Sequence, residues 1–522
     1  MKHIYILWVA LVLSATILSC KKGGVAPLPE DNIGTTISPV AQLKAQATTE
    51  ENELALSWTN PEDEHLMKVE ISYSPTATPT AASPNPVLVD AASGAQATLK
   101  IKLPVHAKYT IRAVTINRAG VRSVPATVEA TPFKPGTVVE PEPEDLANRF
   151  LKRTDTLMTS LVAHFLEGKY MDMWTNDYPY QVGDFWQNAA MAWGHGAAFS
   201  GYAAFKEAAE GKTDYKTKIQ NLYDNRLLTS IDKLRNRKNG KAEAYAVWPG
   251  DTDERFYDDN IWIGIDMADL YMLTKNQKYL DRAEMVWTFV LEGTDNAMGG
   301  GVYWKEYGDS KNTCSTAPAA VLAAKLYEAT KKPAYLNSAK SLYSWVKQHL
   351  QDPSDYLYWD NVKLSDKNNP NSALLVDKSK FSYNSGQPMQ AAALLYNITN
   401  EQQYLTDAQN IAKSAYKRWF IPFNSYTIGQ SFRILAPDHV WFQAIMFRGF
   451  VELYKIDKNR AYVSAYEKTM ENAWRSNARN RGTNMINDDF RGGTTQTSWE
   501  ILFQGACLEM LARLAALEQQ GL

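Results

Sequence analysis

Two adjacent carboxylates, Asp258 and Asp259, open a segment with helical periodicity, YDDNIWIGI at residues 257–265. On a helix, Asp258 extends the apolar row of Ile261 and Ile265, whereas Asp259 lies about 100° further around the axis. Glycoside hydrolysis uses two carboxyl groups that approach one bond, about 5–5.5 Å apart when configuration is retained. Aspartate is also favoured at helix N-caps and in the first helical turn, so a structural role for this pair stays open.

Other familiar catalytic motifs are missing from the sequence. It contains no GxSxG nucleophile elbow, no HExxH zinc helix and no GxxxxGK[ST] phosphate loop. The glycine run at 299–301 continues into Val302 rather than into Lys and Ser or Thr, which predicts a tight loop and not a phosphate cradle. The 7 histidines show no pair at metal-ligand spacing. We therefore expect neither a metal nor a cofactor.

The composition indicates a folded protein and makes nucleic acid an unlikely partner. Hydrophobic residues make up 45% of the chain, which is enough for large cores. Because 55 Lys and Arg face 57 Asp and Glu, no basic surface for a phosphate backbone is expected. The 15 Trp and 28 Tyr could stack on sugar rings or simply fill a helical core. Three cysteines are too few for a disulfide framework.

The N-terminus has the features of an export signal. A short polar start precedes an apolar run at 4–17, which is shorter than the about 20 residues of a spanning helix. The run ends in ILSC at 17–20, which resembles a bacterial lipobox with Cys20 as the acylated residue. We expect residues 1–20 to be a lipoprotein signal peptide, 21–38 a flexible tether, and the protein to be exported and lipid-anchored to the outer membrane. The alternative is an ordinary signal peptide with an incidental cysteine.

Residues 39–133 read as a small β-sandwich. Period-two alternation marks strands at 54–58, 69–73, 97–101 and 109–114, separated by turns rich in Pro, Ala, Asn and Gly. Trp58 in an early strand and Tyr109 in a late one resemble a fibronectin type III or immunoglobulin-like module. Such a module binds glycans or acts as a spacer, and the lack of an evident exposed aromatic row favours the spacer. A linker rich in Pro and Glu follows at 134–144.

Residues 145–522 are expected to be all-α. Helical periodicity appears near 145–168, 185–208, 213–235, 257–274, 276–292, 315–331, 333–350, 384–398, 401–418, 438–455, 459–475 and 495–517. Very short turns join several of these segments into antiparallel pairs, which predicts an (α/α)6 toroid with inner and outer rings. An open helical solenoid is the alternative, although no fixed sequence period recurs.

Short motifs occur in a fixed order through this region: FWQN at 185–188, the aspartate segment at 257–264, GGGVYW at 299–304, KNT at 311–313, DNV at 360–362 and FSYNSG at 381–386. In this order they resemble glycoside hydrolase family 76, the bacterial α-1,6-mannanases with an (α/α)6 fold. The resemblance does not extend to the β-sandwich. Phe381 departs from the usual Trp of the family, and Cys314 is a further departure beside KNT.

The resemblance implies a retaining, endo-acting hydrolase of α-1,6-mannan, with α-mannan as its partner. Asp258 would be the nucleophile and Asp259 the general acid/base. Candidate sugar-binding residues are Trp186, Asn188, Asn312, Thr313, Asp360, Tyr383 and Asn384. A capping role is the alternative for several of these. Trp186, Trp248 and Trp441 could stack on sugar rings, and packing in the core is the favoured alternative for these three.

Two other functions stay open. An (α/α)6 enzyme of different specificity, such as an unsaturated uronyl hydrolase or an epimerase, would need a basic cluster or proton-shuttling histidines near the site. Only Arg255 and Lys311 stand out among the loops before the expected inner helices. A glycan-binding surface lipoprotein without activity is the second alternative, but such a protein has no need of two adjacent buried carboxylates.

Overall fold

The computed structural model of the chain describes residues 35–48, 52–76, 86–105, 107–132, 148–167, 172–179, 189–238, 240–249 and 254–521. The chain divides into two compact units, Met1–Pro135 and Gly136–Leu522, each with its own hydrophobic core. The predictions for the signal peptide, Cys20, most of the tether, the linker, Trp186 and Asn188 lie outside the described residues. Within the described residues, no helix has the length and apolar character needed to cross a membrane.

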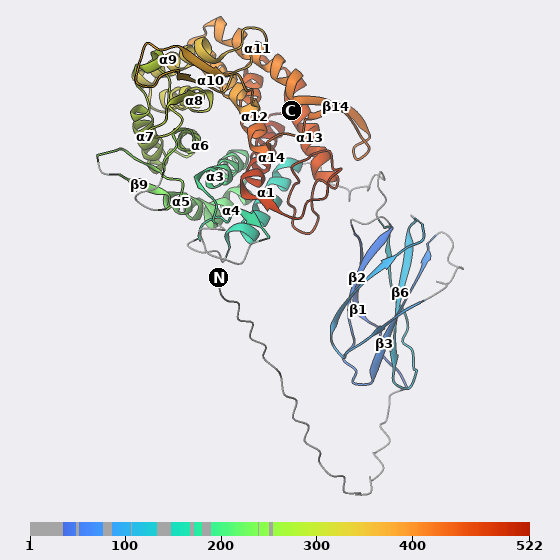
Figure 1. Cartoon of the computed structure of the whole chain (residues 1–522). Helices are drawn as coiled ribbons and strands as arrows, with labels where there is room; N and C mark the ends of the chain where they lie inside the picture. Colours follow the sequence, from blue (N-terminus) through green and yellow to red (C-terminus); the bar gives the residue numbers. More distant parts are fainter. Residues whose placement is uncertain are drawn as a thin grey trace, which may run out of the picture. The chain divides into compact units, whose positions relative to one another are not determined.

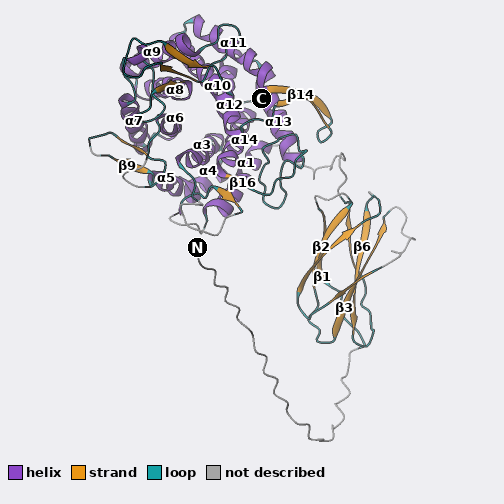
Figure 2. Cartoon of the chain, in the orientation of Figure 1, coloured by secondary structure: helices purple, strands orange, loops and turns teal. Residues whose placement is uncertain are grey.

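The N-terminal unit contains two antiparallel sheets (Figure 2). Its described strands are β1 (Ala41–Ala47), β2 (Glu53–Thr59), β3 (Leu66–Pro75), β4 (Val87–Asp90), β5 (Gln96–Lys102), β6 (Tyr109–Asn117) and β7 (Ala126–Ala130). One sheet has the order β1-β2-β5 and the other β4-β3-β6-β7. The predicted strands all fall within these elements, and the predicted sandwich architecture is confirmed.

Alternation along the strands builds the core of this sandwich. Leu56 and Trp58 of β2 and Ile71 of β3 are buried in one cluster, so side chains from both sheets meet between them. The Tyr109 hydroxyl donates to the Val105 carbonyl at 3.1 Å, which ties the start of β6 to the preceding loop. The assignment to the fibronectin type III class stays a prediction.

The second unit is a closed ring of helices (Figure 1). In the described part of the chain, the inner helices are α3 (Ala192–Ala208), α6 (Tyr257–Thr274), α8 (Thr313–Thr330), α10 (Ser382–Thr399), α12 (Val440–Asp457) and α14 (Ile501–Gln519). Each inner helix packs against the next, and α14 packs against α3, so the ring closes. The (α/α)6 toroid is therefore confirmed, and the open solenoid is wrong.

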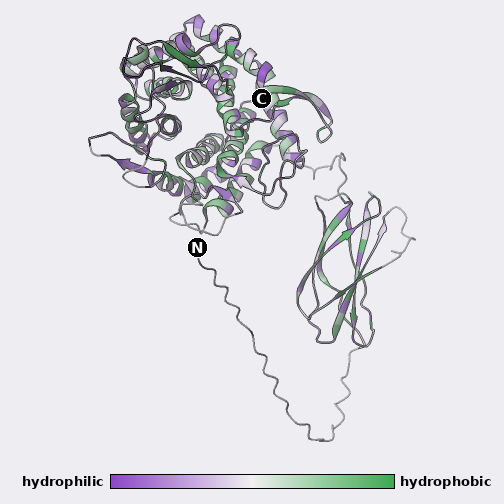
Figure 3. Cartoon of the chain, in the orientation of Figure 1, coloured by the Kyte–Doolittle hydropathy of each residue, from purple (hydrophilic) through white to green (hydrophobic). Residues whose placement is uncertain are grey.

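An outer layer of helices surrounds this ring. It comprises α1 (Arg149–Leu161), α4 (Thr213–Ile219) with α5 (Asn225–Asp232), α7 (Gln277–Glu292), α9 (Pro333–Leu350), α11 (Gln402–Trp419) and α13 (Arg460–Arg475). Inner helices such as α8 are buried nearly all round, whereas α13 buries one stripe that includes Val463, Tyr466 and Met470. Figure 3 shows hydrophilic stretches on outer helices such as α11, while α12 and α14 are mainly hydrophobic.

The connections differ at the two ends of the ring. At the C-terminal ends of α6, α8, α10 and α12, one left-handed residue starts a short turn to the outer helix: Lys275, Lys331, Asn400 and Lys458. The longer connections meet at the N-terminal ends of the inner helices. They carry β11 (Ser310–Asn312), β12 (Asn361–Leu364), β13 (Leu374–Asp377), β14 (Phe420–Ser425) and β15 (Gln430–Leu435). We call the first the turn end and the second the loop end.

Most helix predictions agree with the structure to within a few residues, but three do not. The segment at 213–235 breaks at η3 (Gln220–Asp224), a π-helical turn between α4 and α5, and its last residue belongs to strand β9 (Arg235–Arg237). The predicted helix at 495–517 begins only at Ile501, because β16 (Trp499–Glu500) pairs with β8 (Asp177–Tyr178). The predicted helix at 185–208 begins at Ala192, since the described residues 189–191 are not helical.

Candidate active site

The aspartate pair, Asp258 and Asp259, lies in the first turn of α6 at the loop end of the ring. The loop before α8 holds this turn in place: the backbone N–H of Tyr257 donates to the Trp304 carbonyl at 2.9 Å. The N-cap residue, Phe256, provides no side-chain cap, so neither aspartate serves as the N-cap of α6. Both aspartates are half-buried.

Three donors surround the carboxylate of Asp258. Oδ2 accepts the indole Nε1–H of Trp304 at 3.0 Å and the Sγ–H of Cys314 at 3.4 Å. Oδ1 accepts the backbone N–H of Asp259 at 3.0 Å. Burial raises the pKa of Asp258 to about 6, and these three donors oppose that rise because they stabilise the ionised form.

The carboxyl group of Asp259 has different surroundings. Among the described residues, no donor forms a hydrogen bond with this group. Burial and the neighbouring charge of Asp258 raise the pKa of Asp259 well above its ordinary value. Asp259 is therefore the member of the pair that keeps a proton when Asp258 has lost its own.

A triple-glycine loop supports Trp304. Gly299, Gly300 and Gly301 all have positive φ, and a Cβ on Gly301 would lie 2.7 Å from the Trp345 ring, so no larger residue fits there. Lys311 Nζ donates to the Gly300 carbonyl at 2.7 Å and fixes the loop from below. The glycine run is a tight loop, as predicted.

The residues predicted to bind sugar fall into two groups. Asp360 and Tyr383 are half-buried near the aspartate pair, and the Tyr383 side chain lies close enough to the Cys314 thiol for each group to influence the pKa of the other. Asp360 Oδ1 accepts Nδ2–H of Asn384 at 2.9 Å, and burial raises the pKa of Asp360.

The second group is buried and bonded to protein groups. The Thr313 hydroxyl donates to the Trp359 carbonyl at 2.6 Å, and Asn312 Oδ1 accepts from Ser310 at 2.8 Å. Asn384 is fully buried behind Asp360. These three residues brace the loops that carry Asp360 and Trp304, so their geometry favours an indirect role.

Aromatic rings from other inner helices line the same end of the ring. The Tyr383 ring stacks on Phe442 with centroids 4.0 Å apart, and Phe442 stacks on His439 at 4.0 Å. His439 in turn stacks on Trp193 at 5.3 Å. All four rings are partly exposed, and we call them the aromatic wall. Of its members, only Tyr383 belongs to the predicted set of sugar-binding residues.

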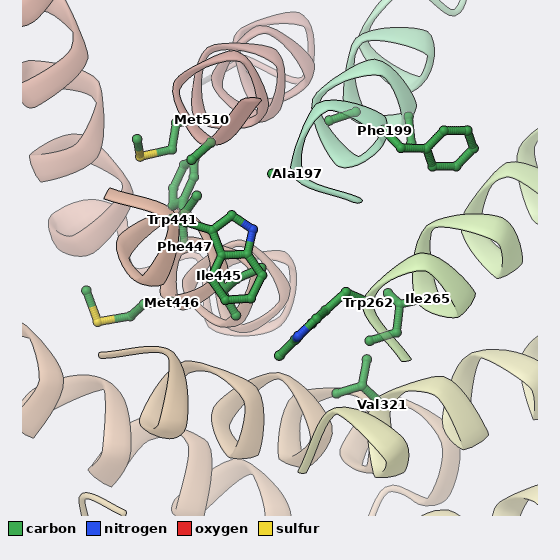
Figure 4. Packing of buried hydrophobic residues seen from close by; sticks show 14 of the residues in the cluster. Ala197, Phe199, Trp262, Ile265, Val321, Trp441, Ile445, Met446, Phe447 and Met510 are labelled. Carbon is green, nitrogen blue, oxygen red and sulfur yellow. The ribbon is translucent and has the colours of Figure 1, made fainter. Parts of the chain in front are cut away.

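Two buried tryptophans form the layer beneath. Trp262 and Trp441 pack edge to face with centroids 5.2 Å apart, and Figure 4 shows both rings pointing toward the middle of the ring of helices. Trp441 is only 2% exposed, which makes it a core residue and excludes sugar stacking in this structure. Trp248 is half-buried.

A separate cavity of about 310 Å³ lies at the turn end and receives residues from all six inner helices. Its charged lining includes Asp266, Lys325 and Glu452, far along the helices from the aspartate pair. Among the described residues, no three His, Cys, Asp or Glu side chains lie together as a metal site requires.

Sequence reasoning missed the partners of Asp258. Trp304 belongs to the GGGVYW motif and Cys314 follows KNT, but their convergence on one carboxylate oxygen depends on contacts between distant segments. The basic candidates for recognition of an acidic substrate are already paired: Arg255 with Glu306 at 2.7 Å and Lys311 with Asp295 at 2.6 Å.

Asp259 can donate a proton and Asp258 can provide a carboxylate, and the two residues are adjacent on one helix. Partly exposed aromatic rings at the same end provide apolar faces that suit sugar rings. A pair of carboxyl groups with pKa values displaced from each other is the arrangement that acid/base chemistry at one bond requires. This combination is typical of a glycoside hydrolase.

Comparison with known proteins agrees with this chemistry. The family model for glycosyl hydrolase family 76 matches residues 155–521. The chain is similar to a family 76 glycoside hydrolase from a bovine Bacteroides thetaiotaomicron strain, with 34% identity, TM-score 0.67, and coverage of 92% of this chain and 100% of that chain. It is also similar to the mannosidase Bt3792 from Bacteroides thetaiotaomicron VPI-5482, with 42% identity, TM-score 0.68, and coverage of 72% of this chain and 100% of that chain.

Matches among curated proteins are partial, and the chain spans about half of their length or less. One is mannan endo-1,6-alpha-mannosidase DCW1 of Candida glabrata, 30% identical over 119 residues, which are 22% of this chain and 26% of that protein. The family model, in contrast, covers the helical ring from the second half of α1 to the end of α14. The chain therefore belongs to glycosyl hydrolase family 76 and is a glycoside hydrolase with an (α/α)6 catalytic unit.

Proposed function

We propose that the protein is a retaining, endo-acting hydrolase of α-1,6-mannosidic bonds in mannan. The observation that carries the mechanism is the unequal surroundings of the aspartate pair. Three donors stabilise the charge of Asp258, whereas Asp259 has none among the described residues and keeps its proton. Asp258 suits a nucleophile that must be ionised, and Asp259 suits a general acid.

The reaction proceeds in two steps. A carboxylate oxygen of Asp258 bonds to the anomeric carbon of one mannose while the bond from that carbon to the glycosidic oxygen breaks. The proton of Asp259 goes to the departing oxygen, which leaves as an alcohol. Water then attacks the anomeric carbon, Asp259 takes its proton, and Asp258 is released as a carboxylate. Two inversions at one carbon return the α-anomer.

The substrate class rests on the relatives together with the lining of the site. A curated relative is named mannan endo-1,6-alpha-mannosidase and a structural neighbour is named mannosidase, so mannan is the substrate we propose. The half-exposed Trp304 beside the nucleophile and the aromatic wall provide a succession of apolar faces around the loop end. Such a surface accommodates a chain of several sugars, which favours internal cleavage.

A uronic acid substrate is less well supported. Arg255 is fully buried and paired with Glu306. The Lys311 ammonium forms an ion pair with Asp295 and hydrogen bonds with backbone carbonyls. Neither cation is free to neutralise a carboxylated sugar. We therefore favour a neutral mannan over the substrate of an unsaturated uronyl hydrolase.

Location and module roles complete the proposal. The lipobox-like ILSC at 17–20 supports export and lipid anchoring to the outer membrane through Cys20. We propose that the β-sandwich is a spacer between this anchor and the catalytic unit. An anchored hydrolase of this kind would act on mannan outside the cytoplasm.

The test compares Asp258→Asn and Asp259→Asn, with Asp309→Asn as a matched control on an exposed position of the same loop as Trp304. On α-1,6-mannan, each variant of the pair should lose at least about 10³-fold in kcat while the control stays near wild type. With an activated aryl mannoside, Asp259→Asn should still release the aryl group and then stall, whereas Asp258→Asn should stay inert. Nuclear magnetic resonance of the wild-type reaction should show the α-anomer first. Survival of turnover in Asp258→Asn, or initial β-anomer, would reject the mechanism.

A further inference from the structure

Cys314 occupies an unusual position for a cysteine. It lies in the first turn of α8, is only 3% exposed, and its Sγ is 3.4 Å from Asp258 Oδ2. The Trp304 indole N–H reaches the same oxygen at 3.0 Å. Two donors from different segments therefore hold one oxygen of the carboxylate, while in the described part of the chain the other oxygen accepts only the local backbone N–H of Asp259.

The thiol also lies between side chains of two other inner helices. It donates to Asp258 of α6, and the Tyr383 side chain of α10 lies close enough to influence its pKa. Tyr383 stacks on Phe442 of α12, so its ring has little freedom to move. A carboxylate that is held through packed neighbours cannot rotate freely about its Cβ–Cγ bond.

We propose that Cys314 is a positioning residue for the reaction: together with the indole of Trp304, its thiol fixes Oδ2 of Asp258 and thereby sets the orientation in which that carboxylate meets the anomeric carbon. This inference rests on the proposed function, in which Asp258 is the nucleophile. It concerns a residue outside the aspartate pair and outside the residues predicted to bind sugar.

The chemistry of the thiol fits this role. Burial, with the charges of Asp258 and Asp360, raises the pKa of Cys314 well above its ordinary value, so the group remains an S–H donor and never a competing anion. The titratable groups that act on Asp258 are Asp259 on α6, Cys314 on α8, Tyr383 on α10, and Asp360 through the thiol. Loss of one donor to a carboxylate removes stabilisation of its charged form.

The first experiment measures kcat/KM for α-1,6-mannotetraose against pH in the full-length chain. Cys314→Ala should lower kcat/KM by about 10-fold and move its acidic limb to higher pH, because Asp258 then ionises less readily. Cys314→Ser, which retains a donor, should recover part of the loss and return the limb toward wild type. Trp304→Phe should move the limb in the same direction as Cys314→Ala.

Cys507→Ala is the matched control, since Cys507 is 1% exposed on α14 and is not bonded to the aspartate pair among the described residues. A limb that moves equally in Cys507→Ala and Cys314→Ala would overturn the positioning role and indicate a general effect of a core cavity. A limb that stays fixed in Cys314→Ala would overturn it as well.

The second experiment is independent of turnover. The S–H stretching band of Cys314, followed by infrared spectroscopy in a Cys507→Ala background, should shift when Asp258→Asn is added, because the acceptor loses its charge. An unchanged band would overturn the thiol–carboxylate contact. If the wild-type enzyme fails to cleave the tetrasaccharide, the proposed function falls and the positioning role falls with it. If the wild-type enzyme is active and the acidic limb of kcat/KM does not move in Cys314→Ala, only the positioning role of Cys314 is rejected.

Discussion

The two ends of the helical ring hold their carboxylates in contrasting ways. At the turn end, acidic side chains meet cations within the cavity lining or just beneath it: Asp269 with Lys325 at 2.5 Å, Glu452 with Lys455 at 3.0 Å and Glu509 with Arg513 at 2.7 Å. At the loop end, no Lys or Arg in the described part of the chain forms an ion pair with Asp258 or Asp259. Helix α6 therefore carries an acid paired with a cation, Asp269, towards one end and the aspartate pair without such a cation at the other.

This difference separates structural carboxylates from reactive ones. Burial opposes ionisation of Glu509, yet Arg448 and Arg513 lower its pKa, so it is a stable anion. Burial raises the pKa of Asp258 to about 6 with only neutral donors against it. Asp266 shows that a raised pKa alone does not identify a catalytic group, because its pKa is also raised to about 6, although it faces Arg448 in the closed interior. The exposure of the carboxyl groups, and not their titration, distinguishes the half-buried aspartate pair from Asp266, which is 1% exposed.

The largest change in stability should come from the buried ion pairs of Arg448, midway along α12. Arg448 is fully buried, donates to both oxygens of Glu509 at 2.7 and 3.0 Å, and faces Asp266 at 3.4 Å. Arg448→Met should lower the free energy of unfolding by about 3–5 kcal/mol, because the buried Asp266 loses the cation that it faces and Glu509 loses one of its two arginine partners. Urea unfolding followed by circular dichroism measures this loss.

Lys332→Met provides the control for that prediction, since it breaks an exposed pair with Glu284 at 2.6 Å and should cost about 1 kcal/mol or less. Equal losses of unfolding free energy in the two variants would show that burial does not determine how much an ion pair contributes to stability. The folded fraction of Arg448→Met should keep normal kcat, as its partner Asp266 lies about two helical turns along α6 from the aspartate pair.

The next largest effect should appear in the pH dependence of kcat/KM, which reports on the aspartate pair at the loop end. Because Asp258 must be ionised to attack and has a pKa of about 6, kcat/KM should fall about 50-fold between pH 6 and pH 4. On the alkaline side, kcat/KM should decline only above the ordinary range of an aspartate, where Asp259 loses its proton. The two limbs belong to the coupled pair and not to isolated groups.

Stopped assays of initial rate over this pH range, with circular dichroism at each pH, separate ionisation from unfolding. In Asp259→Asn, assayed with an activated aryl mannoside, the alkaline limb should disappear while the acidic limb remains. An acidic limb near the ordinary pKa of aspartate would mean that the carboxylate of Asp258 is solvated, which contradicts its burial.

Asp259→Asn should raise the free energy of unfolding, by less than Arg448→Met lowers it. A carboxyl whose pKa is raised by folding stabilises the fold most when protonated, and that stability is lost as pH rises above the ordinary aspartate pKa of 3.8. Replacing Asp259 by an amide should therefore raise stability by about 1 kcal/mol at pH 7 and by little at pH 4. Thermal unfolding at both pH values measures this difference, and a lower melting temperature at pH 7 would contradict it.

The sequence predicted the helices best where local signals agreed. α6 and α9 have the predicted bounds, since α6 has uninterrupted apolar periodicity and α9 begins with Pro333, a residue favoured in the first helical turn. Residues 213–235 misled the prediction because they keep helical periodicity through a π-helical turn and then enter a hairpin. Strand pairing with a distant segment also set the start of α14 at Ile501, and local pattern cannot reveal it.

The site could be predicted only in part. The aspartate pair stood out because its residue types and spacing are unusual, and Tyr383 and Asp360 lie near it as expected. Trp304 and Cys314 were missed because their function depends on which oxygen they reach across the ring. Thr313 and Asn384 have the polar chemistry of sugar ligands but are buried, and burial depends on tertiary packing that a motif does not encode.

The smallest effect is expected from removing the β-sandwich, which has a hydrophobic core of its own. The two units have separate hydrophobic cores, and all residues of the aspartate pair, the aromatic wall and the turn-end cavity follow residue 148. A shortened chain that begins at Glu144 should therefore fold cooperatively and hydrolyse soluble α-1,6-manno-oligosaccharides with kcat/KM within about twofold of the full chain, the scatter expected when no site contact is lost. Its Arg448→Met and Asp259→Asn variants should also repeat the stability changes of the full chain, with the same signs. If the shortened chain unfolds, or if the stability changes of its Arg448→Met and Asp259→Asn variants become equal in size, the sandwich contributes to the stability of the ring. The contrast between the two ends of the ring would then not be a property of the helices alone.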